Sequence, residues 1–195
     1  MNLSAVTLTG RHVRLEPLAA GHVASLVRHA ADDEVWTHFG GARMNDEAAL
    51  RARVESAQRD LAQGVALTFA VIDLGRAEAA GTTTYFDVSV PDRRLEIGST
   101  WLGRAVWRTA INTEAKLLLL GHAFEVLGCL RVQLKTDIRN LRSQAAIERL
   151  GAVKEGVLRA HMRRRDGSQR DSVMYSIIAD EWPAAKARLA ERLAR

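Results

Sequence analysis

The chain has 195 residues, of which 47% are hydrophobic and 26% are charged, a composition that is typical of a globular protein and argues against disorder. No apolar run approaches the ~18 residues that a membrane span needs, and the first residues lack the basic head and apolar middle of a signal peptide. Because 28 basic residues are offset by 23 acidic ones, the formal net charge of +5 suits a small anionic ligand as well as a nucleic acid.

The first third of the chain is predicted to be rich in helix. Two short extended pieces occupy Val6–Pro17, and the apolar positions of Val23–Ala30 fall on one helical face. A short segment over 32–41 ends at a pair of glycines. Asn45 is predicted to cap the next helix, which continues to Gly64.

A mixed sheet is predicted for the middle of the chain. Runs rich in apolar residues or threonine cover Val65–Asp73 and Gly81–Val90, and they precede the strand that bears Glu96. The short links between these strands indicate an antiparallel meander. After a central helix, Arg131–Thr136 alternates strictly, with Val132, Leu134 and Thr136 facing one way. A strand, a helix and a further strand form a crossover, so the sheet is expected to turn parallel here.

The last third is predicted to add two helices and two strands. Asn140 can cap a helix that Gly151 ends. The strands Val153–Leu158 and Ser172–Ile178 follow, and Asp180 is predicted to cap the final helix. No linker, repeat or low-complexity tract interrupts the chain, so residues 1–195 are expected to form one α/β domain.

A strand, a basic loop and a long buried helix follow one another over residues 96–127. Strict alternation in the strand places Glu96 and Thr100 on the same face. The helix is apolar nearly all round and lacks proline, so it must be covered on most sides. Its N-terminus offers free backbone N–H groups, which attract phosphate. The polar and basic side chains of the preceding loop and first turn are Arg104, Arg108, Thr109 and Asn112.

Several kinds of chemistry lack their usual residues. The six histidines show no paired spacing, and the single cysteine, Cys129, supplies neither an internal disulfide nor a thiolate cluster, so no metal site is expected. His122, in the central helix, is interpreted as a hydrogen-bonded core histidine rather than a catalytic one. The motifs GxxxxGK[ST] and GxSxG are absent, which removes the anchors of nucleotide hydrolysis and of serine-hydrolase chemistry.

The segment Arg159–Arg170 is the one local cluster of basic residues. Its Asp166-Gly167 pair is typical of a hairpin turn, so the segment is interpreted as a solvated turn with charged flanks. A nucleic-acid-binding surface is the alternative interpretation of the same residues.

Three segments together resemble the GNAT superfamily of acyl-CoA-dependent N-acetyltransferases, in its RimJ/RimL-like branch. EIGSTWL resembles the fourth strand of that family, and the Thr-Glu-Ala that opens the central helix is characteristic of the branch. NLRSQAAIERLGAVKEGVLR matches its Asn-x-x-Ser, Glu-x-Leu-Gly and Glu-Gly pattern. Their order and spacing fit over about residues 7–183, which is far more specific than any one segment.

The resemblance implies a single GNAT-like α/β domain with a mixed, mostly antiparallel sheet of about seven strands, helices on both faces and a central pair of strands that diverge. Acetyl-CoA would be the acyl donor, with its pyrophosphate at the loop before the central helix and no metal. That loop departs from the family pattern, because Trp107, Ala110 and Asn112 occupy the positions of the usual Gln/Arg, Gly and Gly/Ala. By the resemblance, the residues that hold the cofactor are Trp101, Leu102, Arg104, Trp107, Arg108, Thr109, Ala110, Ile111, Asn112, Thr113, Asn140 and Ser143, and Arg142 could meet the remaining phosphates.

Two side chains are implied to be catalytic. Glu96 would take the proton of the attacking amine, through water, because free alkylamines titrate near ~10. Backbone N–H groups near Trp101 and Leu102 would hold the oxyanion. Ser143 takes the place of the tyrosine that protonates the leaving thiolate in many relatives. Each has a structural alternative: Glu96 could be a solvated residue or only orient substrate, and Ser143 and Asn140 could simply cap a helix.

The sequence therefore predicts an N-acetyltransferase that moves an acetyl group directly to a primary amine, of a protein N-terminus or a small molecule, in the cytoplasm. A domain that senses acyl-CoA without turnover is one alternative, and a nucleic-acid-binding protein is a less favoured one. The acceptor stays open, although acidic residues such as Asp32, Asp33 and Asp87 would favour a cationic acceptor if they line the site. The chain could also form a homodimer.

Overall fold

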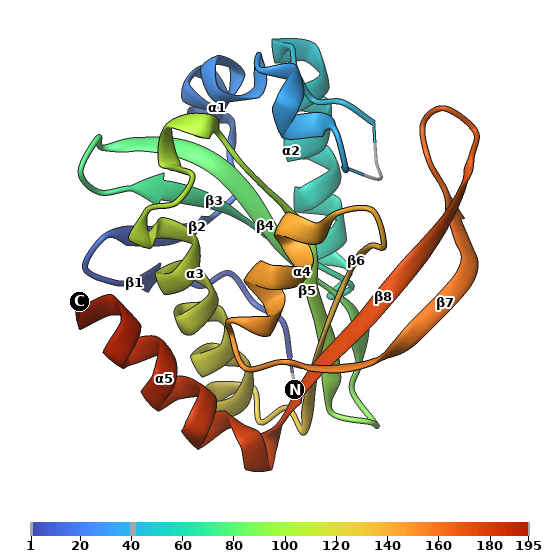
Figure 1. Cartoon of the computed structure of the whole chain (residues 1–195). Coiled ribbons are helices and arrows are strands. Elements are labelled where there is room, and N and C mark those ends of the chain that lie inside the picture. Colours follow the sequence, from blue (N-terminus) through green and yellow to red (C-terminus); the bar gives the residue numbers. More distant parts are fainter. Residues whose placement is uncertain (1, 40–41, 195) are drawn as a thin grey trace.

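The computed structural model describes residues 2–39 and 42–194, in which eight strands form one sheet with five α-helices around it (Figure 1). The strands are β1 (Leu8–Thr9), β2 (Val13–Pro17), β3 (Leu67–Asp73), β4 (Glu78–Ser89), β5 (Arg94–Leu102), β6 (Arg131–Asp137), β7 (Val153–Arg163) and β8 (Gln169–Ile178). The helices are α1 (Val23–Ala30), α2 (Glu47–Ala62), α3 (Ala110–Gly121), α4 (Leu141–Glu148) and α5 (Trp182–Ala194).

The strands lie in the order β1-β2-β3-β4-β5-β6-β8-β7. Every neighbouring pair is antiparallel except β5 and β6, which are parallel and are joined through α3. The mixed, mostly antiparallel sheet and the parallel crossover at its centre are therefore confirmed. Eight strands form rather than about seven.

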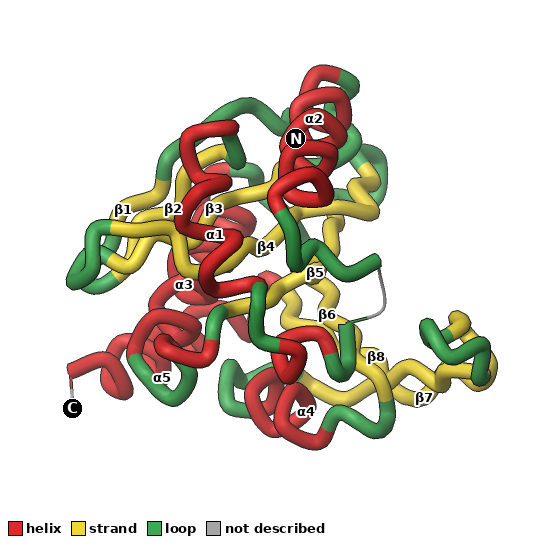
Figure 2. Tube along the Cα trace, turned by 90° about the horizontal axis from the view of Figure 1, so that it is seen from above, coloured by secondary structure: helices red, strands yellow, loops and turns green. Residues whose placement is uncertain are grey.

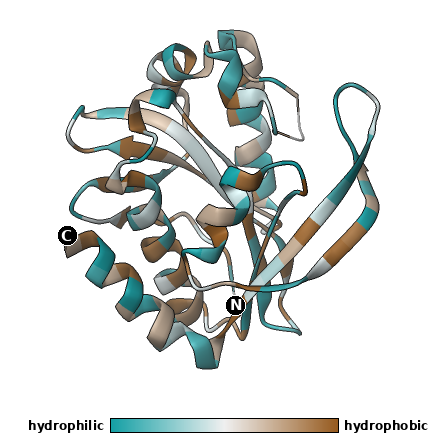
Figure 3. Ribbon diagram, viewed as in Figure 1, coloured by the Kyte–Doolittle hydropathy of each residue, from teal (hydrophilic) through white to brown (hydrophobic). Residues whose placement is uncertain are grey.

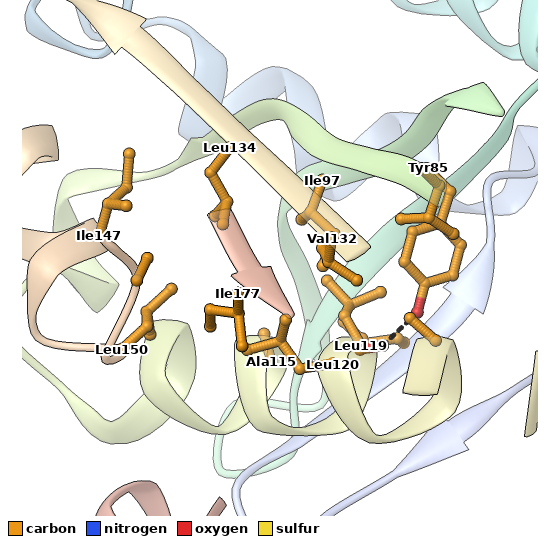
Figure 4. Packing of buried hydrophobic residues seen from close by; sticks show 14 of the residues in the cluster. Tyr85, Ile97, Ala115, Leu119, Leu120, Val132, Leu134, Ile147, Leu150 and Ile177 are labelled. Carbon is orange, nitrogen blue, oxygen red and sulfur yellow. Dashed lines mark hydrogen bonds between the residues drawn. The ribbon is translucent and has the colours of Figure 1, made fainter. Parts of the chain in front are cut away.

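Helices cover the two faces of the sheet as separate layers. On one face, α3, α4 and α5 share a core with the sheet. Leu189 of α5 belongs to this core, and Figure 4 shows Leu119 of α3 and Ile147 of α4 in it. In that core the buried hydroxyl of Tyr85 donates to the carbonyl of Leu119 at 2.6 Å. On the other face, α1 and α2 pack on β3 and β4 around the buried Trp36. Figure 2 shows the strands running between α2 and α5.

Two predicted helix caps are wrong. Asp46, not Asn45, caps α2, because its side chain accepts the N–H of Ala49 at 2.8 Å. Asp180 lies inside a 3-10 turn, Ala179–Glu181, that leads into α5, and Glu181 accepts the N–H of Ile178 at 3.0 Å.

Other boundaries also differ from the expectation. The central helix is α-helical only to Gly121 and then widens into a π-helical turn, His122–Val126. The predicted end of the short segment at residues 40–41 lies outside the described residues.

Strands β7 and β8 form a long hairpin that extends beyond the body of the protein (Figure 1). Both strands are longer than predicted, and the turn falls at the predicted glycine, Gly167, whose φ is 81°. The outer end of the hairpin is hydrophilic (Figure 3). Arg165 at this end nevertheless reaches back to the main body, where it donates to the backbone carbonyl of Trp36.

Candidate active site

Strands β5 and β6 separate after a short stretch of pairing. Three residue pairs join them, and the last is Glu96 with Gln133. Beyond this pair β5 continues to Leu102 and β6 to Asp137, and no pairing between the two strands is present. The expected divergence of the central strands is thus confirmed. It leaves two facing strand edges whose backbone N–H and C=O groups can pair with something other than each other.

A β-bulge interrupts β5 immediately after the divergence begins. Gly98 lies opposite Thr84, and Trp101 lies opposite Thr82, so two residues of β5 face only one of β4. Ser99, in the bulge, has a φ of 46°. The extra residue reverses the alternation, so that Trp101 packs on the α1 and α2 side.

The prediction that Glu96 and Thr100 share a face is therefore wrong. The hydroxyl of Thr100 contacts the ammonium group of Lys116 on α3, at 2.8 Å. Glu96 lies opposite Phe86, on the face that Trp101 also occupies. A single inserted residue moves every later side chain to the opposite face, and alternation counted along the sequence does not detect it.

Glu96 lies at the point where the strands part and is only 1% exposed. Its Oε2 atom accepts hydrogen bonds from the Gln133 side chain at 2.9 Å and from the Lys135 ammonium at 3.0 Å. Lys135 also lies 5.3 Å from the centre of the Phe86 ring. In the described part of the chain Oε1 has no hydrogen-bond partner. The Lys135 ammonium thus pairs with one carboxylate oxygen, and the second oxygen remains available as a proton acceptor.

The loop after β5 leads into the N-terminus of α3. Thr109 caps the helix, because its hydroxyl accepts the N–H of Ile111 at 3.3 Å and donates to the carbonyl of Val106 at 2.8 Å. The first N–H groups of a helix have no carbonyl partner within it. Arg108 is exposed and has a φ of 62°, a conformation that favours glycine.

Trp107 connects this loop with the start of α4. Its indole N–H donates to the carbonyl of Leu102 at 2.7 Å, and the Arg142 guanidinium lies 3.8 Å from the centre of its ring. Arg104 lies 5.9 Å from the same ring and pairs with Glu34 at 3.1 Å. Three of the residues expected near phosphate are therefore neighbours, and cation–π contact orients Arg142.

The remaining cofactor candidates lie in the first turns of α3 and α4. Ile111 is buried in the main core, so only its backbone could face a ligand. Ala110, Asn112 and Thr113 are half-buried in the first turn of α3. Asn140 caps α4 as predicted, with Oδ1 accepting the N–H of Ser143 at 3.0 Å. The backbone of Ser143 takes part in this cap, whereas its hydroxyl does not.

Glu114 has a role that sequence reasoning missed. Its buried carboxylate accepts the backbone N–H groups of Arg11, His12 and Val13 at 2.8, 2.6 and 2.8 Å. A Cβ atom at Gly10 would lie 2.5 Å from the Glu114 carboxyl carbon. The acidic residue of the Thr-Glu-Ala motif therefore fastens the first turns of α3 to the turn between β1 and β2, rather than serving only the helix dipole.

Lys116 was also missed, since it precedes a run of four leucines in the predicted buried helix. The side chain is buried and donates to the hydroxyls of Thr83 at 3.2 Å and Thr100 at 2.8 Å. Burial lowers the pKa of this amine to about 7. The lysine therefore supports the bulged part of β5 from the α3 side.

The acidic residues that would have favoured a cationic acceptor are paired with arginines. Asp32 lies 3.5 Å from Arg104, and Asp87 lies 2.9 Å from Arg94. Asp33 pairs with Arg43. Their charges are thus largely compensated within the protein.

The described residues contain no group of three or more histidine, cysteine, aspartate or glutamate side chains that could hold a metal ion. Among residues 2–39 and 42–194, no helix is both long and apolar enough to cross a membrane.

Comparison with known proteins agrees with this architecture. The family model described as an acetyltransferase (GNAT) domain matches residues 12–153. A relative from Bacillus subtilis (strain 168), named as a ribosomal N-acetyltransferase, YdaF, is 31% identical over 106 residues, which are 54% of this chain and 57% of the relative. The chain thus spans a little over half the length of the curated relatives that it matches.

Solved structures match over almost the whole chain. An acetyltransferase structure from T. thermophilus has 44% identity and a TM-score of 0.88, and the match covers 99% of this chain and 100% of that one. The RimJ protein of Mycobacterium smegmatis, in complex with CoA-disulfide, has 22% identity and a TM-score of 0.82, with 96% and 93% covered, which shows a shared fold. Since the family model covers well over half of the sequence and the divergent strands are present, the chain belongs to the GNAT acetyltransferase family.

Proposed function

We propose that this chain is an acetyl-CoA-dependent N-acetyltransferase that moves the acetyl group directly to a primary amine. The observation that carries the proposal is the placement of the buried Glu96 carboxylate at the last residue pair before β5 and β6 diverge. One of its oxygens is held by Lys135 and Gln133, and the other has no partner among the described residues.

The cofactor would lie along the diverging strands, with its pyrophosphate at the N-terminus of α3. The basic groups around that helix end support this assignment, since Arg108 is exposed beside it and Arg142 stacks on Trp107. Helix N-termini and arginines are well suited to bind phosphate oxygens. The amide groups of the pantetheine arm could then pair with the free strand edges.

The acetyl group would pass directly from the thioester to the amine nitrogen. Glu96 accepts a proton from the acceptor ammonium, through water, and the free amine nitrogen attacks the thioester carbonyl carbon. Backbone N–H groups near Trp101 and Leu102 stabilise the oxyanion. When the oxyanion collapses, the C–S bond breaks and the Ser143 hydroxyl donates a proton to the leaving thiolate. The amide nitrogen loses its second proton, which returns to the Ser143 oxygen through water. Cys129 is buried and burial raises its pKa to about 11, which does not favour an acyl-enzyme intermediate.

An acyl-CoA sensor without turnover is the second candidate, because Ala110 and Asn112 replace the small residues of the family's phosphate loop. Calorimetry with acetyl-CoA, combined with thiol release across a panel of primary amines, separates the two. Amine-dependent thiol release supports the transferase, whereas tight binding without release on any amine supports the sensor.

The matched variants Arg142→Gln and Arg149→Gln test the cofactor position. Both residues lie at ends of α4 and both are exposed, but only Arg142 stacks on Trp107. Loss of a charged hydrogen bond to phosphate should weaken acetyl-CoA binding at least about tenfold in Arg142→Gln, and Arg149→Gln should bind as the unmodified protein does. Equal binding by both variants would contradict the assigned pyrophosphate position.

A further inference from the structure

Three buried side-chain atoms that can donate a hydrogen bond have no partner in the described part of the chain. They are Nε1 of Trp101, Nε of Arg170 and Oγ of Ser172. These side chains are 3%, 7% and 0% exposed. A buried donor without a partner costs about 1–3 kcal/mol, so such groups are rare in folded proteins and each calls for an explanation.

The three donors lie on the same face of the sheet. Ser172 is opposite Asp137 in the pairing of β6 with β8, and Arg170 follows the same alternation two residues earlier. Asp137 shares its face with Lys135 and hence with the Glu96 carboxylate. The bulge in β5 turns Trp101 to this face as well.

The donors also lie at the same end of the sheet. Asp137 is the last residue of β6, and Trp101 is the penultimate residue of β5. Because β5 and β6 are parallel, these positions mark the end at which the two strands diverge. The donors therefore lie on the face opposite α3, at the end of the sheet where β5 and β6 diverge beyond Glu96.

Two guanidinium groups share one carboxylate in the same region. Arg164 binds both oxygens of Asp137, at 2.6 and 2.9 Å, and the backbone N–H of Arg139 adds a third bond at 2.9 Å. Arg170 is left with its Nε atom 4.0 Å from the same carboxylate. Burial lowers the pKa of Arg170, and attraction to Asp137 and Glu96 opposes this effect.

Lys135 thus pairs with Glu96, whereas Arg164 and Arg170 share the Asp137 carboxylate, and only Arg164 is hydrogen-bonded to it. Asp166 and Asp171 act on Arg164 and not on Arg170. A buried guanidinium needs a counter-charge and hydrogen-bond acceptors. A group that supplies negative charge and several acceptor oxygens would satisfy it, whereas a polycationic amine would be repelled.

We propose that the acceptor of this transferase is an amine that also carries an anionic group, and that Arg170 and Ser172 bind this group while the amine faces Glu96. The inference rests on the proposed function and specifies its substrate class. Carboxylates and phosphates share the required chemistry, since both offer several oxygens to a guanidinium and a hydroxyl.

Matched pairs of amines test the proposal by acetyl-CoA-dependent thiol release. Each of glycine, β-alanine and 4-aminobutyrate is compared with its own primary amide. O-phosphoethanolamine is compared with ethanolamine, and cadaverine represents polycations. We expect kcat/KM to favour at least one anionic amine over its neutral partner by at least about tenfold, the value of one hydrogen bond to a charged group. Preference for a carboxylate or for the phosphate identifies the source of the anion.

The variants Arg170→Gln and Ser172→Ala should reduce this preference about tenfold or more, chiefly through KM, and Arg170→Lys should retain part of it. Arg159→Gln, at an exposed position of β7, is the control and should leave the preference unchanged. A higher kcat/KM for the neutral amines or for cadaverine would overturn the proposal. An equal loss of kcat/KM for the anionic and the neutral member of a pair in Arg170→Gln would also overturn it.

A binding measurement separates failure of this inference from failure of the proposed function. N-acetyl-β-alanine and its amide are titrated by calorimetry into the protein with and without coenzyme A. Tighter binding of the carboxylate, reduced in Arg170→Gln, supports the anion site even where no amine is turned over. Equal binding of the two probes overturns it, whatever the outcome of the thiol assay.

Discussion

Replacing Glu114 with glutamine should destabilise the protein far more than the small chemical change suggests. The carboxylate is 6% exposed and accepts three backbone N–H groups, one through Oε1 and two through Oε2. An amide keeps only one acceptor oxygen and turns an NH₂ group toward the remaining donors. At least one buried N–H then loses its partner, and the charge that strengthens all three bonds is gone.

The expected loss in the free energy of unfolding is about 2–4 kcal/mol, from one or two buried donors at roughly 1–3 kcal/mol each. In a chain of this size 1 kcal/mol corresponds to about 2–4 °C, so the melting temperature should fall by roughly 5–15 °C. Thermal unfolding followed by circular dichroism measures this shift. The control Glu47→Gln, exposed in the first turn of α2, should stay within about 0.5 kcal/mol. A Glu114→Gln protein as stable as this control would refute the anchoring role.

Three further predictions concern the loop, the buried lysine and the cap of α4. Arg108→Gly should raise the free energy of unfolding by about 1 kcal/mol, because glycine adopts the left-handed φ of 62° without strain. The same variant should bind acetyl-CoA more weakly in calorimetry, and tighter binding would contradict a phosphate contact by Arg108. Burial lowers the pKa of Lys116 from 10.5 to about 7, so the unfolded chain binds an extra proton between these values. Stability measured by urea unfolding should therefore rise from pH 7 to pH 10 relative to Lys116→Met, and a constant difference between the two proteins would show that the amine does not titrate in this range. Asn140→Ala should lose about 1 kcal/mol in the same assay, whereas Asn140→Asp keeps the cap oxygen and should lose little; equal losses would rule out the cap.

The order of elements could be predicted from the sequence because local patterns specify it. The strand, loop and helix around Glu96 were expected and are present, and so is the parallel crossover that follows. Asn140 was identified as a cap from its residue type alone. These features depend on alternation, periodicity and turn chemistry within a few residues.

The errors arise where distant residues decide the outcome. The bulge at Ser99 depends on the pairing of β5 with β4, and it exchanges the faces of Thr100 and Trp101. The partners of Glu114 lie about one hundred residues earlier, in the turn between β1 and β2. The tolerance of Lys116 within a buried helix depends on two threonine hydroxyls from neighbouring strands. No local pattern reports such contacts.

The cluster of unpaired donors on β8 was hidden for a related reason. Arg170 was interpreted as part of a solvated turn, but β8 begins at Gln169 and the side chain is buried beside Asp137. The basic segment Arg159–Arg170 therefore includes one arginine, Arg170, whose side chain lies on the face of the candidate site.

The catalytic role of Glu96 is tested most directly by amine-dependent release of coenzyme A, measured for Glu96→Gln, the unmodified protein and Glu47→Gln. We expect kcat/KM for the amine to fall about 100-fold or more in Glu96→Gln, while calorimetry shows unchanged acetyl-CoA binding. The residual activity of this variant should rise with pH, as more of the free amine forms without help from the carboxylate. Undiminished release by Glu96→Gln, with the same pH dependence as the unmodified protein, would contradict the role of this carboxylate at the divergence of β5 and β6.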